Sequence, residues 1–226
     1  MPGLDAWNAG GRMRELIPAI KGLWEGDYAH EGQYWQFPAT TSAPKPLQKN
    51  LPIWVAARDP NSHDFAVGQG CNVQVTPLHM AHDEVVSLME RFNAAVANHP
   101  EVERPKIMIL QHGYVAESAA DADLAADELN AFYNYFGAWF VNKRPIHQGM
   151  IAEITPEEMA AHPVYSPKVM RDNLLIGQAP EVVERLKKIE SLGYDEFSLW
   201  IDSGMSFARK RASLERFIAD VMPAFA

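Results

Sequence analysis

The residues with the clearest chemical potential lie in a polar turn between an apolar run and a helical pattern. Arg58, Asn61 and Ser62 occupy this turn, and the helical pattern continues through residues 65–68. The first backbone N–H groups of a helix are unpaired and carry a partial positive charge, and an arginine adds a forked cation. This combination suits an anion such as a phosphate. Asn61 and Ser62 are also good N-caps, so a capped surface turn is the alternative interpretation.

The elements around this turn repeat in a regular order. Short apolar runs rich in β-branched residues predict strands over 53–57, 72–76, 106–114 and 196–202. Apolar residues at helical spacing predict a helix after each strand, including one capped by Asp83. About four strand–helix units predict a parallel α/β sheet, here in a single domain over residues 1–226.

Three stretches, taken in order, carry a resemblance to a known family. The first comprises residues 15–24, followed by Glu31-Gly-Gln-Tyr-Trp35 and residues 44–48, and the second is residues 51–77. The third comprises residues 175–180, followed by Leu192-Gly-Tyr-Asp-Glu-Phe197 and residues 221–225. Together they resemble the C-terminal half of a bacterial-luciferase-like, flavin-dependent monooxygenase. The resemblance implies a TIM-barrel-like (β/α)8 fold of which this chain supplies the second half. The first four strands of that family, which often carry a Glu-His-His cluster near the flavin, have no counterpart here.

The family resemblance also implies a cofactor and residues that bind it. Family members use reduced FMN and O2 to oxygenate an organic substrate, with a deazaflavin as the alternative cofactor in related barrels. They hold the FMN phosphate at the turn after the fifth strand, which falls here on Ala57, Arg58, Asn61 and Ser62. Several members have a Glu-Ser pair where this chain has Ala57-Arg58, so a cation replaces a hydroxyl. Thr76, at the end of the next strand, is expected to face the flavin ring or the substrate.

The candidates for catalytic residues are Gln111 and His112, near the C-terminal end of the strand over 106–114. The C-terminal ends of strands line the active face of (β/α)8 enzymes, so either side chain could hydrogen-bond a flavin edge or a substrate. A satisfied polar group at a strand end is the alternative for each. An aromatic cluster follows in the next helix and could form a substrate pocket, an interface or ordinary core; its members are Phe132, Tyr133, Tyr135, Phe136, Trp139 and Phe140.

Composition narrows the classes of function. A formal net charge of −9 argues against a nucleic-acid partner, and the basic stretch over 209–211 is predicted to be solvated. Cys71 is the only cysteine, which fits a reducing cytoplasm. Residues 1–10 lack the pattern of a signal peptide, and no apolar run approaches membrane-spanning length. His79 and His82 lack acidic or cysteine partners, so no metal site is predicted.

Two other hypotheses remain open for the function of the chain. One is a non-catalytic flavin-binding protein or a truncated, subunit-like paralogue; the other is a longer natural protein whose gene start has been misplaced. Four parallel strands would leave two open sheet edges, which invite pairing. We therefore expect a homo-oligomer or a partner that supplies the N-terminal half. The family resemblance adds a flavin reductase as an expected partner.

Overall fold

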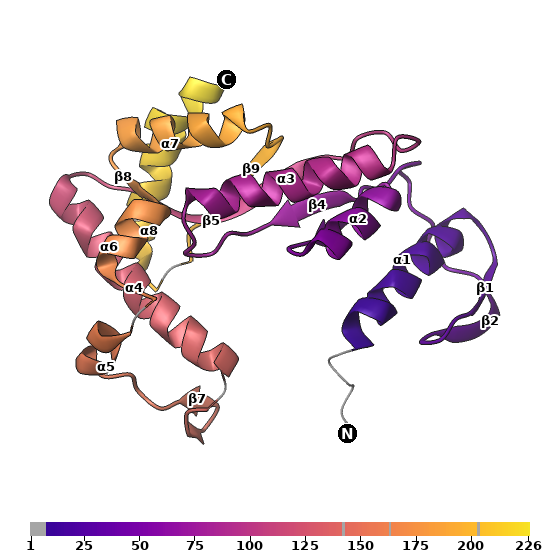
Figure 1. Ribbon diagram of the computed structural model, residues 1–226, viewed down its shortest axis with the longest axis horizontal. Helices are drawn as coiled ribbons and strands as arrows, with labels where there is room; N and C mark the ends of the chain where they lie inside the picture. The colour runs from indigo at the N-terminus through magenta and orange to yellow at the C-terminus, as the bar shows by residue number, and fades with distance from the viewer. Residues whose placement is uncertain (1–7, 142, 163, 203) are drawn as a thin grey trace. The chain divides into compact units, whose positions relative to one another are not determined.

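The computed structural model describes residues 8–141, 143–162, 164–202 and 204–226, which form two compact units (Figure 1). The first unit comprises the described residues up to Val73 together with Ala94–Pro105, and the second comprises Gln74–Asn93 and Lys106–Ala226. The division falls within strand β4 (Asn72–Val75) and helix α3 (His82–Asn98).

The first unit contains a helix, a hairpin and a strand–helix pair: α1 (Ala9–Glu25), β1 (Tyr28–Glu31), β2 (Gln36–Thr40), β3 (Trp54–Ala56) and α2 (Pro60–Gly68). Helix α1 packs beside the hairpin (Figure 1). The Glu15 carboxylate of α1 accepts hydrogen bonds from the backbone N–H groups of Gln33, Tyr34 and Trp35, at 2.8, 2.9 and 3.1 Å. One carboxylate therefore fixes the hairpin turn against the helix.

The second unit contains the longer strands and helices. In chain order they are β5 (Ile107–Val115), α4 (Ala119–Val141), β6 (Ile146–His147), β7 (Met150–Ile151), α5 (Pro156–Ala161), α6 (Pro167–Asn173), β8 (Leu175–Gly177), α7 (Ala179–Ser191), β9 (Glu196–Trp200) and α8 (Phe207–Arg216). A π-helical turn over Phe217–Val221 and a 3₁₀ turn over Met222–Phe225 end the chain. Strand β5 pairs in parallel with both β8 and β9, so these strands share one direction.

Most predicted elements are confirmed, with two corrections. Strand β8 was not predicted from the sequence, because its three residues are too few to show a period. Asp83 does not cap α3, since the helix already begins at His82 and Asp83 lies in its first turn. An acidic residue in that position still interacts favourably with the partial positive charge of the helix N-terminus.

A cluster of buried side chains holds α4 against α6 and β8. Figure 1 shows α6 beside α4. The start of α4 is fixed by Arg209, which pairs with the carboxylates of Asp121 and Glu128. Its guanidinium carbon also lies 5.0 Å from the centre of the Tyr114 ring. The prediction that Arg209 is solvated is therefore wrong, because only 22% of its side chain is exposed.

Helix α8 completes the hydrogen bonding of the last residue of β5. The buried N–H of Val115 donates to Ser213 Oγ at 2.8 Å, and Arg216 Nη1 donates to the Val115 carbonyl at 3.0 Å. A buried backbone group without a partner costs about 1–3 kcal/mol, so these two side chains of α8 stabilise the strand end.

Candidate functional site

The polar turn before α2 is organised by a residue that sequence reasoning did not single out. Asp59 is the N-cap of α2, and Pro60 is the first helical residue. The Asp59 carboxylate accepts hydrogen bonds from the Ser62 backbone N–H at 3.1 Å and from the Ser62 hydroxyl. The prediction that Asn61 or Ser62 caps this helix is therefore wrong. A proline at the first helical position was the available signal, because it places the cap one residue earlier.

This cap changes the electrostatics expected of the turn. Hydrogen bonding from the Ser62 side chain lowers the pKa of Asp59, so the group is an anion at neutral pH. The same carboxylate occupies both donors of Ser62. A phosphate at these donors would have to displace Asp59, so Ser62 does not fit as a phosphate ligand in the arrangement seen here. Arg58 and Asn61 are exposed beside it, whereas Ala57 is buried.

Thr76 directly follows β4 and shapes the turn there. Its hydroxyl accepts a hydrogen bond from the backbone N–H of Leu78 at 3.4 Å, and Leu78 has a positive φ of 55°. A non-glycine residue in this conformation is uncommon, and a local hydrogen bond of this kind helps to hold it. Thr76 belongs to the second unit, whereas Ala57, Arg58, Asn61 and Ser62 belong to the first.

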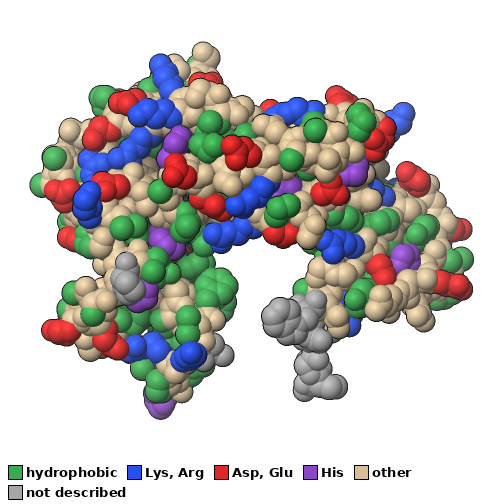
Figure 2. All heavy atoms as spheres, viewed as in Figure 1, with side chains coloured by type: hydrophobic (Ala, Val, Ile, Leu, Met, Phe, Trp, Pro, Cys, Tyr) green, Lys and Arg blue, Asp and Glu red, His purple; other side chains and the backbone are tan. Residues whose placement is uncertain are grey.

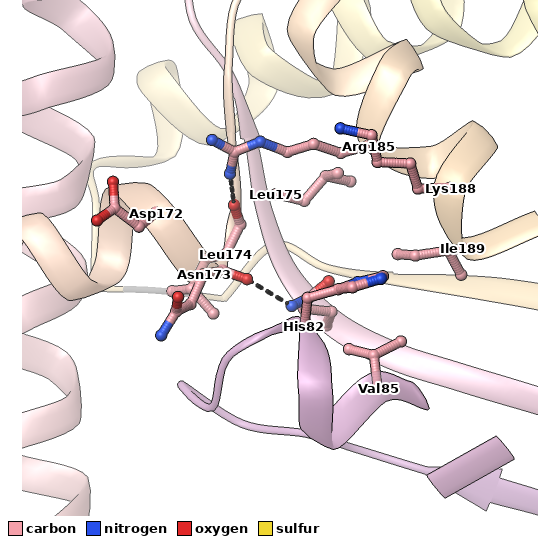
Figure 3. A pocket seen from close by; sticks show the side chains of 10 residues that line it. His82, Val85, Asp172, Asn173, Leu174, Leu175, Arg185, Lys188 and Ile189 are labelled. Carbon is pink, nitrogen blue, oxygen red and sulfur yellow. Dashed lines mark hydrogen bonds between the residues drawn. The ribbon is translucent and has the colours of Figure 1, made fainter. Parts of the chain in front are cut away.

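Gln111 lines a pocket of about 310 Å³ in the second unit. Its side-chain amide donates to the Asn173 carbonyl at 2.9 Å, and only 4% of the residue is exposed. The cations at this pocket also have partners. Arg185 donates to the backbone carbonyl of Leu174 (Figure 3). It also donates to the carbonyl of Arg171 at 3.0 Å, and Lys188 pairs with Glu184. These bonds hold the end of α6 and the start of β8.

His112 is almost fully buried, at 1% exposure, and lies in an aromatic environment. Its Nδ1 lies 2.8 Å from the Tyr133 hydroxyl, and its ring stacks on the Trp200 indole with centroids 3.8 Å apart. Burial lowers the pKa of His112 to about 4, although the backbone and carboxylate of Asp202 favour the protonated form. The imidazole is therefore neutral at pH 7. Adjacent strand residues point to opposite faces, so Gln111 and His112 are not brought together.

The C-terminal half of α4 carries the aromatic cluster predicted from the sequence, and its members divide by burial. Tyr133 is buried, whereas Trp139 and Phe140 are exposed at 62% and 66%. Figure 2 shows hydrophobic side chains gathered on the surface over this part of α4. Phe132 and Phe136 are half-buried, and they stack with ring centroids 5.6 Å apart. Core packing therefore accounts for one part of the cluster only.

Two features are absent from the described residues. Within residues 8–141, 143–162, 164–202 and 204–226, no group of three or more His, Cys, Asp or Glu side chains is arranged to hold a metal ion. No helix in this part of the chain is long and apolar enough to cross a membrane.

Comparison with known proteins assigns the family. Residues 2–196 match the sequence model of the family described as "Luciferase-like monooxygenase". The chain belongs to the luciferase-like monooxygenase family, as the resemblance in its sequence predicted. All of its 226 residues align at 65% identity with the oxygenase component of a flavin-dependent trigonelline monooxygenase from Acinetobacter baylyi, and they span 63% of that protein.

Solved structures confirm the predicted fold class, a partial TIM-barrel-like (β/α)8 fold. The chain is similar to the monooxygenase RslO1 from Streptomyces bottropensis, with a TM-score of 0.70 and 21% identity over 99% of this chain and 64% of that one. It is also similar to the oxygenating constituent of 3,6-diketocamphane monooxygenase from Pseudomonas putida, solved in complex with FMN. The TM-score is 0.62 and the identity 15%, over 95% of this chain and 63% of that one. An F420-dependent secondary alcohol dehydrogenase shares the fold too, with a TM-score of 0.66 and 15% identity over 94% of this chain and 60% of that one.

Proposed function

We propose that this chain acts in the oxygenase component of a flavin-dependent monooxygenase that uses reduced FMN and O2. The observation that carries this proposal is the 65% identity, over all 226 residues, to a protein described as such a component. Bound reduced flavin would supply the electrons that activate O2, and the residues of the chain would bind flavin and substrate and exclude water. FMN is favoured over a deazaflavin because that relative is described as flavin-dependent. We also propose a cytoplasmic location, which the single cysteine supports.

The partners follow from the same relative. A protein described as an oxygenase component has a separate counterpart, so we propose that a flavin reductase supplies reduced FMN to this chain. The substrate in the name of that relative, trigonelline, is the first compound to test. We also propose that the chain associates with itself or with a partner that supplies the N-terminal half of the barrel. Light scattering of the purified chain tests this proposal.

Activity is tested with the purified chain, a flavin reductase, NADH, FMN and trigonelline under ¹⁸O₂. We expect O2 uptake that depends on both the chain and the substrate, with one labelled oxygen atom in each product molecule. The reductase alone provides the background rate of flavin oxidation. Unlabelled substrate and an O2 uptake equal to this background would contradict the proposal. Tight FMN binding without turnover would instead support a non-catalytic flavin-binding protein.

We propose that the FMN phosphate binds at Arg58 and Asn61, and reaches Ser62 only by displacing Asp59. Replacing Asp59 with Asn removes one negative charge and keeps a good N-cap. We therefore expect Asp59→Asn to bind FMN roughly tenfold more tightly, and Arg58→Ala roughly tenfold more weakly, in calorimetric titrations.

Asp64→Asn is the matched control for this experiment, because it removes the same charge from the same helix at a site beside Asn98 and His99. An FMN dissociation constant that is the same for Asp59→Asn and the unmodified chain would place the phosphate elsewhere. Equal effects of Asp59→Asn and Asp64→Asn would show a general charge effect rather than a phosphate site.

A further inference from the structure

Three half-buried aromatic side chains of the second unit lie together in a corner. They are not among the candidate catalytic or flavin-binding residues. They are Trp200 at the end of β9 and Phe132 and Phe136 on α4, here called the aromatic corner. The two phenylalanines lie four residues apart and therefore on one face of the helix. Each stands nearly perpendicular to the indole, at interplanar angles of 82° and 80° and centroid distances of 6.0 and 6.4 Å.

The indole of Trp200 is held in place from one side. His112 stacks on it with an interplanar angle of 18°, and His112 is in turn fixed by its contact with the Tyr133 hydroxyl. The accessible part of the half-buried indole is therefore the surface that His112 leaves uncovered. Phe136 is contacted by Phe140, whose ring meets it edge-on at a centroid distance of 4.8 Å. These contacts set the angles of the corner before any ligand binds.

The electrostatics of this corner favour a flat organic cation. The faces of aromatic rings are negative, and cations bind them most strongly at tryptophan. Burial keeps His112 neutral, so the imidazole behind the indole does not repel a cation. Asp202, two residues beyond Trp200, places a carboxylate close enough to His112 to favour its protonation, and Lys210 pairs with that carboxylate at 3.0 Å. The negative faces of these rings do not attract the phosphate of FMN.

We propose that the aromatic corner binds the substrate of the chain, and that this substrate is an aromatic cation of the N-alkylpyridinium class. The inference rests on the proposed function, because trigonelline, an N-methylpyridinium carboxylate, is the substrate in the name of the 65% identical relative. The pyridinium ring stacks on the Trp200 indole, and Phe132 and Phe136 enclose the edges of the ring. These three residues determine the choice of substrate and take no part in proton transfer.

Binding to the 226-residue chain is measured without flavin or O2, so that it does not depend on turnover. Trigonelline is titrated by calorimetry, and its N-methyl proton resonance is followed by NMR, since stacking on an indole moves that resonance upfield. Nicotinate, which has the same carboxylate and no ring charge, is the comparison ligand. We expect trigonelline to bind roughly five to twenty times more tightly than nicotinate and to show the upfield shift.

Substitutions in the aromatic corner test whether the bound trigonelline lies there. Trp200→Leu and Phe136→Leu are each expected to weaken trigonelline binding roughly fivefold or more, and Trp200→Phe to weaken it less, because a smaller ring remains. Trp139→Leu is the matched control, since it removes an exposed indole from the same helix. Thermal unfolding of each variant shows whether it is folded, and Trp200→Phe keeps the test decisive if Trp200→Leu does not fold.

Three results would overturn the inference: no trigonelline binding, equal binding of trigonelline and nicotinate, or displacement of trigonelline by FMN with the same sensitivity to Trp200→Phe. The last result would make the corner a flavin site. The activity assay with ¹⁸O₂ fails or succeeds independently of these titrations. Binding without turnover leaves the inference standing and refutes the proposed function, whereas turnover with equal binding of both ligands does the reverse.

Discussion

Acidification from pH 6.5 to pH 4 is expected to lower the free energy of unfolding by about 3 kcal/mol through His112 alone. Its pKa in the folded chain is about 4, below the ordinary value of 6.5, because the ring is buried. The unfolded state therefore binds a proton first as the pH falls, and protonation pulls the equilibrium toward unfolding. This contribution of His112 is complete above pH 6.5 and is lost as the pH approaches 4.

Urea unfolding of the unmodified chain and of His112→Gln, each at several pH values, isolates this effect. The stability difference between the two proteins should shrink by about 3 kcal/mol between pH 7 and pH 4. The comparison is needed because His99, paired with Asp64 and Glu101, has a raised pKa and contributes with the opposite sign. Parallel stability curves for the two proteins would show that the pKa of His112 is the same in the folded and unfolded states, and that burial does not lower it.

Loss of the Asp121 carboxylate is expected to be the most destabilising single change at the start of α4. This group accepts hydrogen bonds from the Tyr114 hydroxyl at 3.1 Å, the Glu117 N–H at 3.0 Å and Arg209 Nη2 at 2.7 Å. Asp121→Ala leaves three donors without this acceptor, and one of them is the partly buried Arg209 cation. We expect a loss of about 2–4 kcal/mol in the free energy of unfolding, measured by urea titration.

Two further variants show whether the loss at Asp121 comes from this network. Asp123→Ala, on the same helix with 76% of its side chain exposed, should change stability by less than about 0.5 kcal/mol. In a double-mutant cycle, Arg209→Met should be far less harmful when Asp121 is already Ala, because the two groups are coupled. Additive effects of the two changes would contradict the account.

The sequence predicted the helices and strands well, but it predicted poorly which residues contact each other across the fold. The four strands predicted over 53–57, 72–76, 106–114 and 196–202 correspond to β3, β4, β5 and β9, and their ends differ by no more than two residues. Arg209 was expected to be solvated because its partners Asp121 and Glu128 lie 88 and 81 residues away, a separation over which a sequence gives no sign of contact. Strand β8 was missed for a related reason, since its strand character comes from pairing with β5.

At the candidate site, too, the sequence identified residues better than it identified their contacts, even between residues a few positions apart. Arg58, Asn61 and Ser62 were chosen as polar residues beside a helix start, yet Asp59 has the same chemistry and takes the cap. Proline at the first helical position distinguishes the two choices. His112 was identified from its place on a strand. Its neutrality and its contacts with Tyr133 and Trp200 depend on burial among residues distant in sequence, which only the fold shows.

The bonds from α8 to Val115 bear on the order in which the chain folds. Ser213 and Arg216, which complete the end of β5, lie 98 and 101 positions later in the chain. During synthesis, the strand end therefore keeps its polar groups in water until about 100 further residues have been made. Contacts over such a separation close slowly. Docking of α8 thus completes the end of β5, and nascent chains that stop before Ser213 would carry an unfinished strand.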